Sequence, residues 1–144
     1  MVCPSWTYCS LSHWVCRIDA GSMILGRVND NREAIVQLAL KGNNSQLRLV
    51  RSVVDTGYTG YLMLPQFMIT ELAWQCIGTQ KGVLGDGRVK SFDVYLGTII
   101  WDGEMQEITV NASESEALIG MSLLDGYKIE IEACLGGEVR LTVM

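Results

Sequence analysis

The fold of this chain is decided by one short stretch, Ser52-Val53-Val54-Asp55-Thr56-Gly57-Tyr58-Thr59-Gly60. Asp55 directly follows two β-branched apolar residues, which are typical of a buried strand. The strand cannot continue through the glycine-containing segment that comes next, so the backbone is expected to turn sharply after Asp55. The sequence therefore predicts a carboxylate that is positioned by a rigid strand and carried on a loop, an arrangement that suits catalytic groups.

A purely structural interpretation of Asp55 also exists. Asp followed two positions later by Gly is common in turns, where the carboxylate accepts a backbone hydrogen bond. On that interpretation Asp55 caps a turn and has no chemical role. The tripeptide Asp55-Thr56-Gly57 is compatible with both interpretations, so the sequence around it has to decide between them.

Short strands separated by turn residues extend on both sides of this stretch. One helix is expected at 65–74, where Pro65 suits the first turn and Phe67, Leu72 and their apolar neighbours form a rough apolar face. One helical turn is expected at 120–124. Strands are expected at 24–28, 34–40, 47–54, 61–64, 88–100, 105–112, 117–119, 127–133 and 138–143. This succession predicts an all-β domain, a small closed β-barrel with one or two short helices.

The domain is expected to span residues 23–144. Residues 1–22 show no steady periodicity and lack the pattern of a secretory signal, so we expect an N-terminal extension outside the fold, with Met23 as the natural start. The net charge is −5 and the eleven Lys and Arg residues are scattered, which argues against nucleic-acid binding. No apolar run approaches the roughly 20 residues of a membrane span, so no membrane partner is expected.

The cysteines do not form a pattern that would hold a metal. They are Cys3, Cys9, Cys16, Cys76 and Cys134, without the Cys-x-x-Cys pairs of a zinc site. The sequence therefore predicts no metal site and no cofactor. Cys76 and Cys134 stand among apolar residues and are expected to be small core residues. Unpaired thiols favour a reducing compartment, which predicts a cytoplasmic location.

Two separate stretches carry a resemblance to a known family. The Asp55 stretch resembles the active-site loop of the retropepsin-like aspartic peptidases, in which two apolar residues precede Asp-Thr-Gly. The family's second hallmark is two apolar residues, a glycine and a short helix, and Leu118-Ile119-Gly120 with the residues to Leu124 is similar to it. Between them, the turn Leu84-Gly85-Asp86-Gly87 occupies the place of the family's flap. The resemblance covers about residues 23–144 and is greatest to the small single-domain bacterial members.

The resemblance implies an aspartic endopeptidase that acts on a peptide or protein without a cofactor. Catalysis in this family needs two carboxylates, and this sequence has a single Asp-Thr-Gly. The implied assembly is therefore a homodimer in which each chain contributes one Asp55. Thr56 would join the two loops across the axis, and Gly57 would permit their close approach. The flap turn would close over an extended peptide.

Two departures from the family pattern keep an alternative open. Tyr58 stands where pepsin-like members have Ser or Thr, whose hydroxyl donates to the carboxylate, and Thr59 is the replacement donor that the sequence offers. Met121 stands where retroviral members have an Arg that helps to join the dimer. The alternative is a catalytically weak or inactive module of the same fold for peptide binding or dimerisation. An unrelated β-barrel with a chance Asp-Thr-Gly would need both hallmarks to be accidental.

Overall fold

The computed structural model describes residues 23–144, so the expected extension at 1–22 lies outside the described residues and the boundary at Met23 stays a prediction. Ten strands and two short helices follow one another in this part of the chain. Their bounds are β1 Met23–Val28, β2 Ala34–Lys41, β3 Leu47–Val54, β4 Leu62–Pro65, α1 Gln66–Leu72, β5 Gln75–Val83, β6 Val89–Trp101, β7 Glu104–Ser113, β8 Ala117–Ile119, α2 Met121–Leu124, β9 Tyr127–Ile131 and β10 Glu138–Val143.

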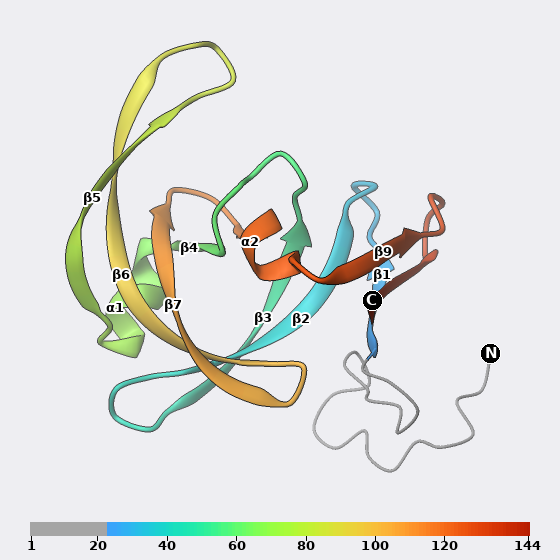
Figure 1. The fold of residues 1–144 in the computed structure, drawn as a ribbon, viewed down its shortest axis with the longest axis horizontal. Helices are drawn as coiled ribbons and strands as arrows, with labels where there is room; N and C mark the ends of the chain where they lie inside the picture. The colour runs from blue at the N-terminus through green and yellow to red at the C-terminus, as the bar shows by residue number, and fades with distance from the viewer. Residues whose placement is uncertain (1–22) are drawn as a thin grey trace.

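Six of the strands close into a barrel (Figure 1). Around the barrel β2 pairs with β6, β6 with β7, β7 with β4, β4 with β8, β8 with β3, and β3 with β2 again. The pairing that completes the circle is short and joins Ala39–Lys41 of β2 to Thr98–Ile100 of β6. Closure removes the unpaired edges that an open sheet of these strands would expose. The predicted small closed β-barrel is confirmed.

The barrel encloses a core of aliphatic side chains with two tryptophans at its rim. Trp74 and Trp101 are each 5% exposed, and the indole N–H of Trp74 donates to the carbonyl of Lys41 at 2.9 Å. Burying such side chains contributes roughly 1.5–3 kcal/mol each, so this core is the main source of stability. The fully buried core side chains include Val36, Leu40, Leu62, Leu64, Leu72, Ile99, Val110, Ile119, Val139 and Leu141.

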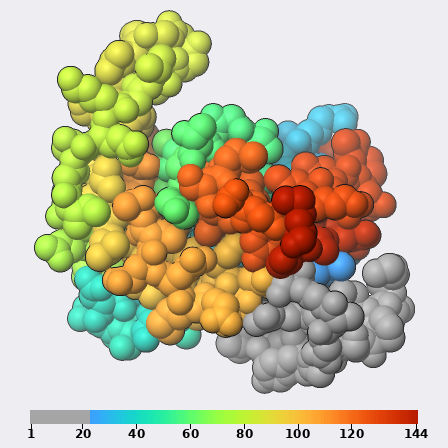
Figure 2. Space-filling view, viewed as in Figure 1, coloured from blue at the N-terminus to red at the C-terminus, as the bar shows by residue number. Residues whose placement is uncertain are grey.

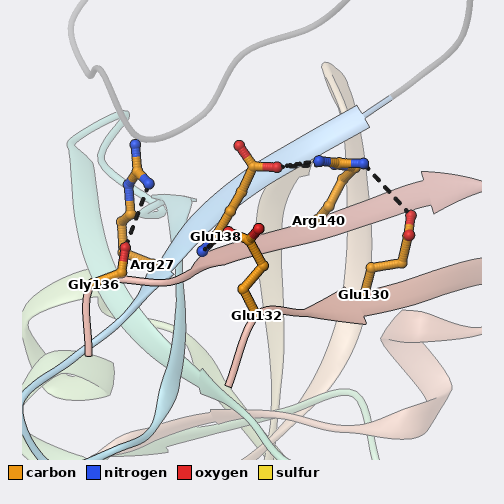
Figure 3. A network of polar contacts seen from close by, with 6 residues as sticks. All are labelled: Arg27, Glu130, Glu132, Gly136, Glu138 and Arg140. Carbon is orange, nitrogen blue, oxygen red and sulfur yellow. Dashed lines mark hydrogen bonds and ion pairs between the residues drawn. The ribbon is translucent and has the colours of Figure 1, made fainter. Parts of the chain in front are cut away.

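Beside the barrel, β1, β10 and β9 form a terminal sheet that joins the first residues of β2. Charged side chains stabilise its outer surface, as Figure 3 shows. Arg140 of β10 forms ion pairs with Glu138 and with Glu130 of β9. The hydrogen bond to Glu138 raises the pKa of Arg140 further above its ordinary value. Because these side chains are partly solvated, we expect each pair to contribute well under about 1 kcal/mol.

The hairpin of β5 and β6 reaches beyond the barrel. Val89–Asp93 of β6 pair only with β5, because pairing with β7 begins at Val94. This part of the hairpin is a two-stranded ribbon that ends in the turn at residues 84–88. Figure 2 shows the ribbon standing out from the body of the molecule as a separate arm. An arm of this kind has few contacts to hold it in one position.

Some details of the sequence prediction were wrong. Cys76 and Cys134 are both exposed and free, so they are not core residues. Apolar neighbours misled the prediction because Cys76 lies on the outlying strand β5 and Cys134 lies in the connection between β9 and β10. The expected helix at 65–74 is shorter and ends at Leu72, because Ala73 has the left-handed conformation of a helix C-cap. Ten strands are present among residues 23–144, where eight or nine were expected.

Candidate active site

Asp55 lies at the point where three strands from distant parts of the chain meet. β3 ends at Val54, and β8 lies beside it in parallel with Val54 opposite Ile119. β4 pairs with the other edge of β8. The backbone N–H of Asp55 continues the β3–β8 pairing by donating to the carbonyl of Ile119 at 2.9 Å. The position of Asp55 is therefore set by the sheet itself rather than by the loop that follows.

The loop after Asp55 is joined to α2 by several hydrogen bonds. Met121 N–H donates to the carbonyl of Tyr58 at 2.8 Å, and Ser122 N–H donates to the carbonyl of Gly60 at 3.1 Å. The hydroxyl of Ser122 donates to the carbonyl of Thr59 at 2.6 Å. In Figure 1 the loop and α2 lie side by side. The backbone N–H groups at the start of this short helix, which have no acceptor within the helix, thus donate to carbonyls of the loop.

Gly120 permits this close approach. A Cβ atom at this position would stand 2.2 Å from the carbonyl oxygen of Gly60 and 2.6 Å from the ring of Tyr58. No other residue would fit without a backbone shift, since real Cβ atoms do not come within 3.0 Å of such atoms. The structure therefore brings the two hallmark stretches together, with Leu118 and Ile119 in β8 and Gly120 against the Asp55 loop.

The Asp55 carboxylate lies partly exposed at the end of the barrel. One of its oxygens accepts the N–H of Gly57 at 2.9 Å. Among the described residues no side chain donates to it; the hydroxyl of Tyr58 is bound elsewhere, and no hydrogen bond joins Thr59 to Asp55. Thr56 and Gly57 are exposed beside it. The carboxylate is therefore held in one orientation while its outer face stays open to a ligand or to another chain.

Tyr58 points away from Asp55 and toward the flap strands. Its hydroxyl lies 2.6 Å from Oδ1 of Asn111 in β7 and 3.3 Å from the carbonyl oxygen of Leu62. Nδ2 of Asn111 in turn donates to Oε1 of Gln80 in β5 at 3.3 Å. Burial raises the pKa of Tyr58 to about 12. A chain of polar side chains thus connects the Asp55 loop to the base of the flap.

A cleft of about 540 Å³ separates the Asp55 loop from the flap. One wall is formed by Gly57–Tyr61 and Ser122, and the other by Gln80–Gly85 of the hairpin, with Phe92, Thr109 and Asn111 between them. Of the four predicted flap residues, Leu84 and Gly85 line the cleft and Asp86 and Gly87 do not. Asp86 instead accepts a hydrogen bond from Arg88 N–H at 3.0 Å, which shapes the turn. Asp55 stands next to this cleft, two residues before its first lining residue.

A second hollow, of about 480 Å³, lies on the other side of the strand that carries Asp55. Val53 and Val54 form its floor, and Ile131 and Cys134 of the terminal sheet form one side. Its lining is mainly apolar, and Ile131 is 44% exposed.

Comparison with solved structures identifies the fold. A retropepsin-like aspartic protease from Rickettsia conorii superimposes with a TM-score of 0.50 at 18% identity, over 85% of this chain and 95% of that one. The chain has a retropepsin-like fold. At this identity the likeness concerns the fold alone, which is the fold that the two hallmark stretches predicted.

Two viral structures are also similar to this retropepsin-like chain. The simian foamy virus protease matches at 22% identity with a TM-score of 0.44, over 61% of this chain and 90% of that one. The foamy viral protease-reverse transcriptase matches at 21% identity with a TM-score of 0.47, over 65% of this chain but only 12% of that much longer one. No protein-family model and no curated protein sequence matches the chain.

Asn111, Gln80 and Ser122 were not predicted as site residues. Asn111 directly follows the buried Val110 in β7, and nothing in its own segment indicates that Tyr58 and Gln80 bind its side chain. None of the helices among residues 23–144 is long and apolar enough to cross a membrane. No group of three or more His, Cys, Asp or Glu residues in the same part of the chain is placed to hold a metal ion.

Proposed function

We propose that this chain is an aspartic endopeptidase that acts as a homodimer, with residues 23–144 as its peptidase domain. The observation that carries the proposal is the position of Asp55. Its backbone N–H donates to the Ile119 carbonyl and its carboxylate accepts the N–H of Gly57, while the side chain stays partly exposed beside a cleft large enough for part of a peptide. A carboxylate with only a capping role would not need an adjoining cleft.

The chemistry requires a second carboxylate. Two carboxylates held about 3 Å apart cannot both ionise, so they share one proton. The ionised one acts as general base on a water molecule, and the protonated one polarises the carbonyl of the scissile peptide bond. The chain has one Asp-Thr-Gly, so a second copy would supply the partner carboxylate.

The surface around Asp55 suits such an assembly. Thr56 and Gly57 are exposed beside the carboxylate, where Thr56 would bind its counterpart across a two-fold axis. The second hollow is lined by Val53 and Val54, the two residues that directly precede Asp55, and by Ile131. A second copy of the chain would complete the dyad and cover this apolar area at the same time. Met121 is 43% exposed next to the loop and would contribute a contact that differs from the retroviral Arg.

The substrate would be an extended peptide lying between the Asp55 loop and the flap. Main-chain hydrogen bonds hold such a peptide as an added strand, and side-chain pockets give selectivity. Closing of the β5–β6 ribbon would exclude water from the reacting atoms. We infer a cytoplasmic location from Cys76 and Cys134, which are exposed and unpaired and would stay so in a reducing compartment.

One observation favours a second candidate, a module of this fold without peptidase activity that binds peptides or dimerises. Among the described residues no side-chain hydroxyl donates to the Asp55 carboxylate, because the Tyr58 hydroxyl is bound to Asn111. The orientation and acidity of the carboxylate then depend on backbone donors and on the partner chain. Cleavage assays separate the two candidates directly.

The test is cleavage of a mixed peptide library by the full chain between pH 4 and 8, beside the Asp55→Asn variant. We expect cuts by the parent and a loss of at least about 100-fold in the variant, since the general base is removed. Circular dichroism and size-exclusion chromatography should show the same fold and the same dimer for both proteins. A dimeric parent that makes no cuts at any pH would favour the second candidate.

The dimeric dyad has a test of its own. Mixing parent with an equal amount of Asp55→Asn chains, with free exchange, places half of the parent chains in mixed dimers that carry one carboxylate. Activity should then fall by about half. Unchanged activity, with exchange verified by mass spectrometry of tagged chains, would contradict a shared dyad.

A further inference from the structure

The hydrogen bonds that lead from Tyr58 through Asn111 to Gln80 of the flap can each be assigned a donor and an acceptor. The 2.6 Å separation between the Tyr58 hydroxyl and Oδ1 of Asn111 suits an O–H···O bond and is shorter than usual for an N–H donor. The raised pKa of Tyr58, about 12, keeps the hydroxyl protonated over the whole working range. Tyr58 is therefore the donor, Asn111 Oδ1 the acceptor, and the Asn111 amide nitrogen faces Gln80.

This series of hydrogen bonds ends at side-chain N–H groups that have no acceptor among the described residues. Asn111 Nδ2 uses one of its two N–H groups on Gln80 Oε1. Nε2 of Gln80 has two more, and no acceptor for them is present among the described residues. Both side chains line the cleft. The open hydrogen-bonding capacity at this place in the cleft thus includes N–H groups, beside the second lone pairs of the two amide oxygens.

No carboxylate among the described lining residues competes with a ligand for these N–H groups. None of the described residues that line it is Asp or Glu, although the chain as a whole carries a net charge of −5. Lys81 is the one charged residue in the lining. Phe92 lies opposite Gln80 in the β5–β6 pairing and gives this part of the cleft an apolar side. The site therefore combines an apolar wall with unpaired donors.

This combination suits a particular kind of side chain. Methylene groups pack against an aromatic ring, while a terminal oxygen accepts the N–H groups. Gln80 is exposed in this structure, and closing of the flap over a peptide would remove its N–H groups from water. An apolar side chain in the same place would then leave these donors unpaired, which is unfavourable. Sites built from buried polar groups discriminate in this way against analogues that lack the matching atom.

We propose that Gln80 and Asn111, held in place by Tyr58, form a polar subsite that selects peptides with an oxygen-acceptor side chain (Gln, Glu, Asn or Asp) beneath the flap. The inference rests on the proposed function, because it names the substrate class of the same cleft. Tyr58 is a positioning residue in this arrangement, since it orients Asn111 and does not itself meet the peptide side chain.

The test uses peptides in matched pairs that differ only by Gln against Met, or by Asn against Leu, scanned through every position of a decapeptide that the full chain cleaves. We expect one position at which the oxygen-bearing peptide has a kcat/KM about three- to tenfold higher, the effect of a hydrogen bond. The Asp55→Asn variant, which retains the cleft, should show the same preference in peptide-array binding without cleavage.

Variants assign the preference to this subsite. Gln80→Met should abolish the preference at that position, whereas Gln75→Met, an exposed glutamine on the same strand outside the cleft, should leave it intact. The paired variant Tyr58→Phe/Asn111→Leu removes donor and acceptor together and should shift the preference to Leu. Circular dichroism would establish that each variant is folded.

The outcomes separate this inference from the proposed function. Cleavage without any preference for acceptor side chains, or a preference untouched by Gln80→Met, overturns the subsite and leaves the peptidase standing. Selective binding by Asp55→Asn, with no cleavage by the parent, overturns the peptidase and supports the subsite. Absence of binding and of cleavage with every peptide overturns both.

Discussion

The two walls of the cleft are built in opposite ways. The Asp55 loop is held by strands on one side and by α2 on the other, through backbone bonds to Ile119, Met121 and Ser122. In the flap ribbon, Val89–Asp93 pair only with β5, and most of its residues are exposed. The comparison teaches that the carboxylate is held in a fixed position, whereas the opposite wall of the cleft keeps the freedom to move that the proposed function requires.

Identical substitutions in the two walls should have opposite outcomes, and this is the largest effect we expect. Gly120→Ala places a Cβ atom against the Gly60 carbonyl and the Tyr58 ring, whereas Gly85→Ala in the flap turn places one in open space. We expect Gly120→Ala to lower the free energy of unfolding by about 1–3 kcal/mol. Urea denaturation should show a change under about 0.5 kcal/mol for Gly85→Ala.

The same pair should separate in activity. Displacement of the Asp55 loop by even about 1 Å would lower kcat/KM about 100-fold in Gly120→Ala. Gly85→Ala should retain most of the parent's activity. Equal losses in both variants would show that the flap turn is as closely constrained as the loop, which would break the comparison between the two walls.

Tyr58 belongs to the rigid wall, and its hydroxyl donates to Asn111 of the barrel strand β7, which in turn contacts Gln80 of the flexible wall. Its pKa is raised from 10.0 to about 12 by burial, so the protonated form is favoured in the folded state. The corresponding stability is fully present below pH 10 and is lost as the pH rises from 10 toward 12. Tyr58→Phe should be less stable than the parent at pH 7 by about 1–2 kcal/mol, because Asn111 loses its donor.

The difference in the free energy of unfolding between the parent and Tyr58→Phe should become smaller at high pH, since only the parent has a Tyr58 hydroxyl to ionise. Urea unfolding at pH 7, 9 and 11 measures this. Tyr61→Phe, at an exposed tyrosine on the same loop, should change stability at pH 7 by under about 0.5 kcal/mol. A constant difference between parent and Tyr58→Phe from pH 7 to 11 would contradict a buried Tyr58 hydroxyl.

The smallest effect is expected from the ion pair that joins the flap to the barrel. Lys90 Nζ lies 3.2 Å from Glu114, and both side chains are largely solvated. A double-mutant cycle of Lys90→Ala and Glu114→Ala should give a coupling energy under about 1 kcal/mol that decreases at high salt. A larger, salt-resistant coupling would mean that the ribbon is fastened to the barrel rather than free to move.

The sequence predicted those parts of the molecule that depend on local patterns. The alternation of apolar residues located most strands, and Asp55-Thr56-Gly57 with Leu118-Ile119-Gly120 predicted the fold before any pairing was known. Chain reversals were also located well, because they depend on nearby glycines and prolines. Each of these features is decided within a few neighbouring residues.

Features that depend on distant neighbours were not predicted. The hydrogen bonds of Asn111 join it to Tyr58 in the Asp55 loop and to Gln80 in β5, so no pattern within β7 could have predicted them. Cys134 is likewise exposed because of the path that the chain takes between β9 and β10, although the residues next to it in the sequence are apolar. The polar chain that crosses the cleft is a property of the tertiary fold and has no signature in any single segment.

The parallel pairing of β3 with β8 also has a consequence for biosynthesis. Val54 and Ile119 are far apart along the chain, and Asp55 N–H finds its acceptor only once residue 119 is in place. During translation, the Asp55 loop therefore stays unorganised until residues 117–124 have left the ribosome. Contacts of such long sequence separation also form late in folding. If the proposed peptidase activity holds, a nascent chain is thus unable to hydrolyse its neighbours at the moment when unfolded polypeptide is most abundant around it.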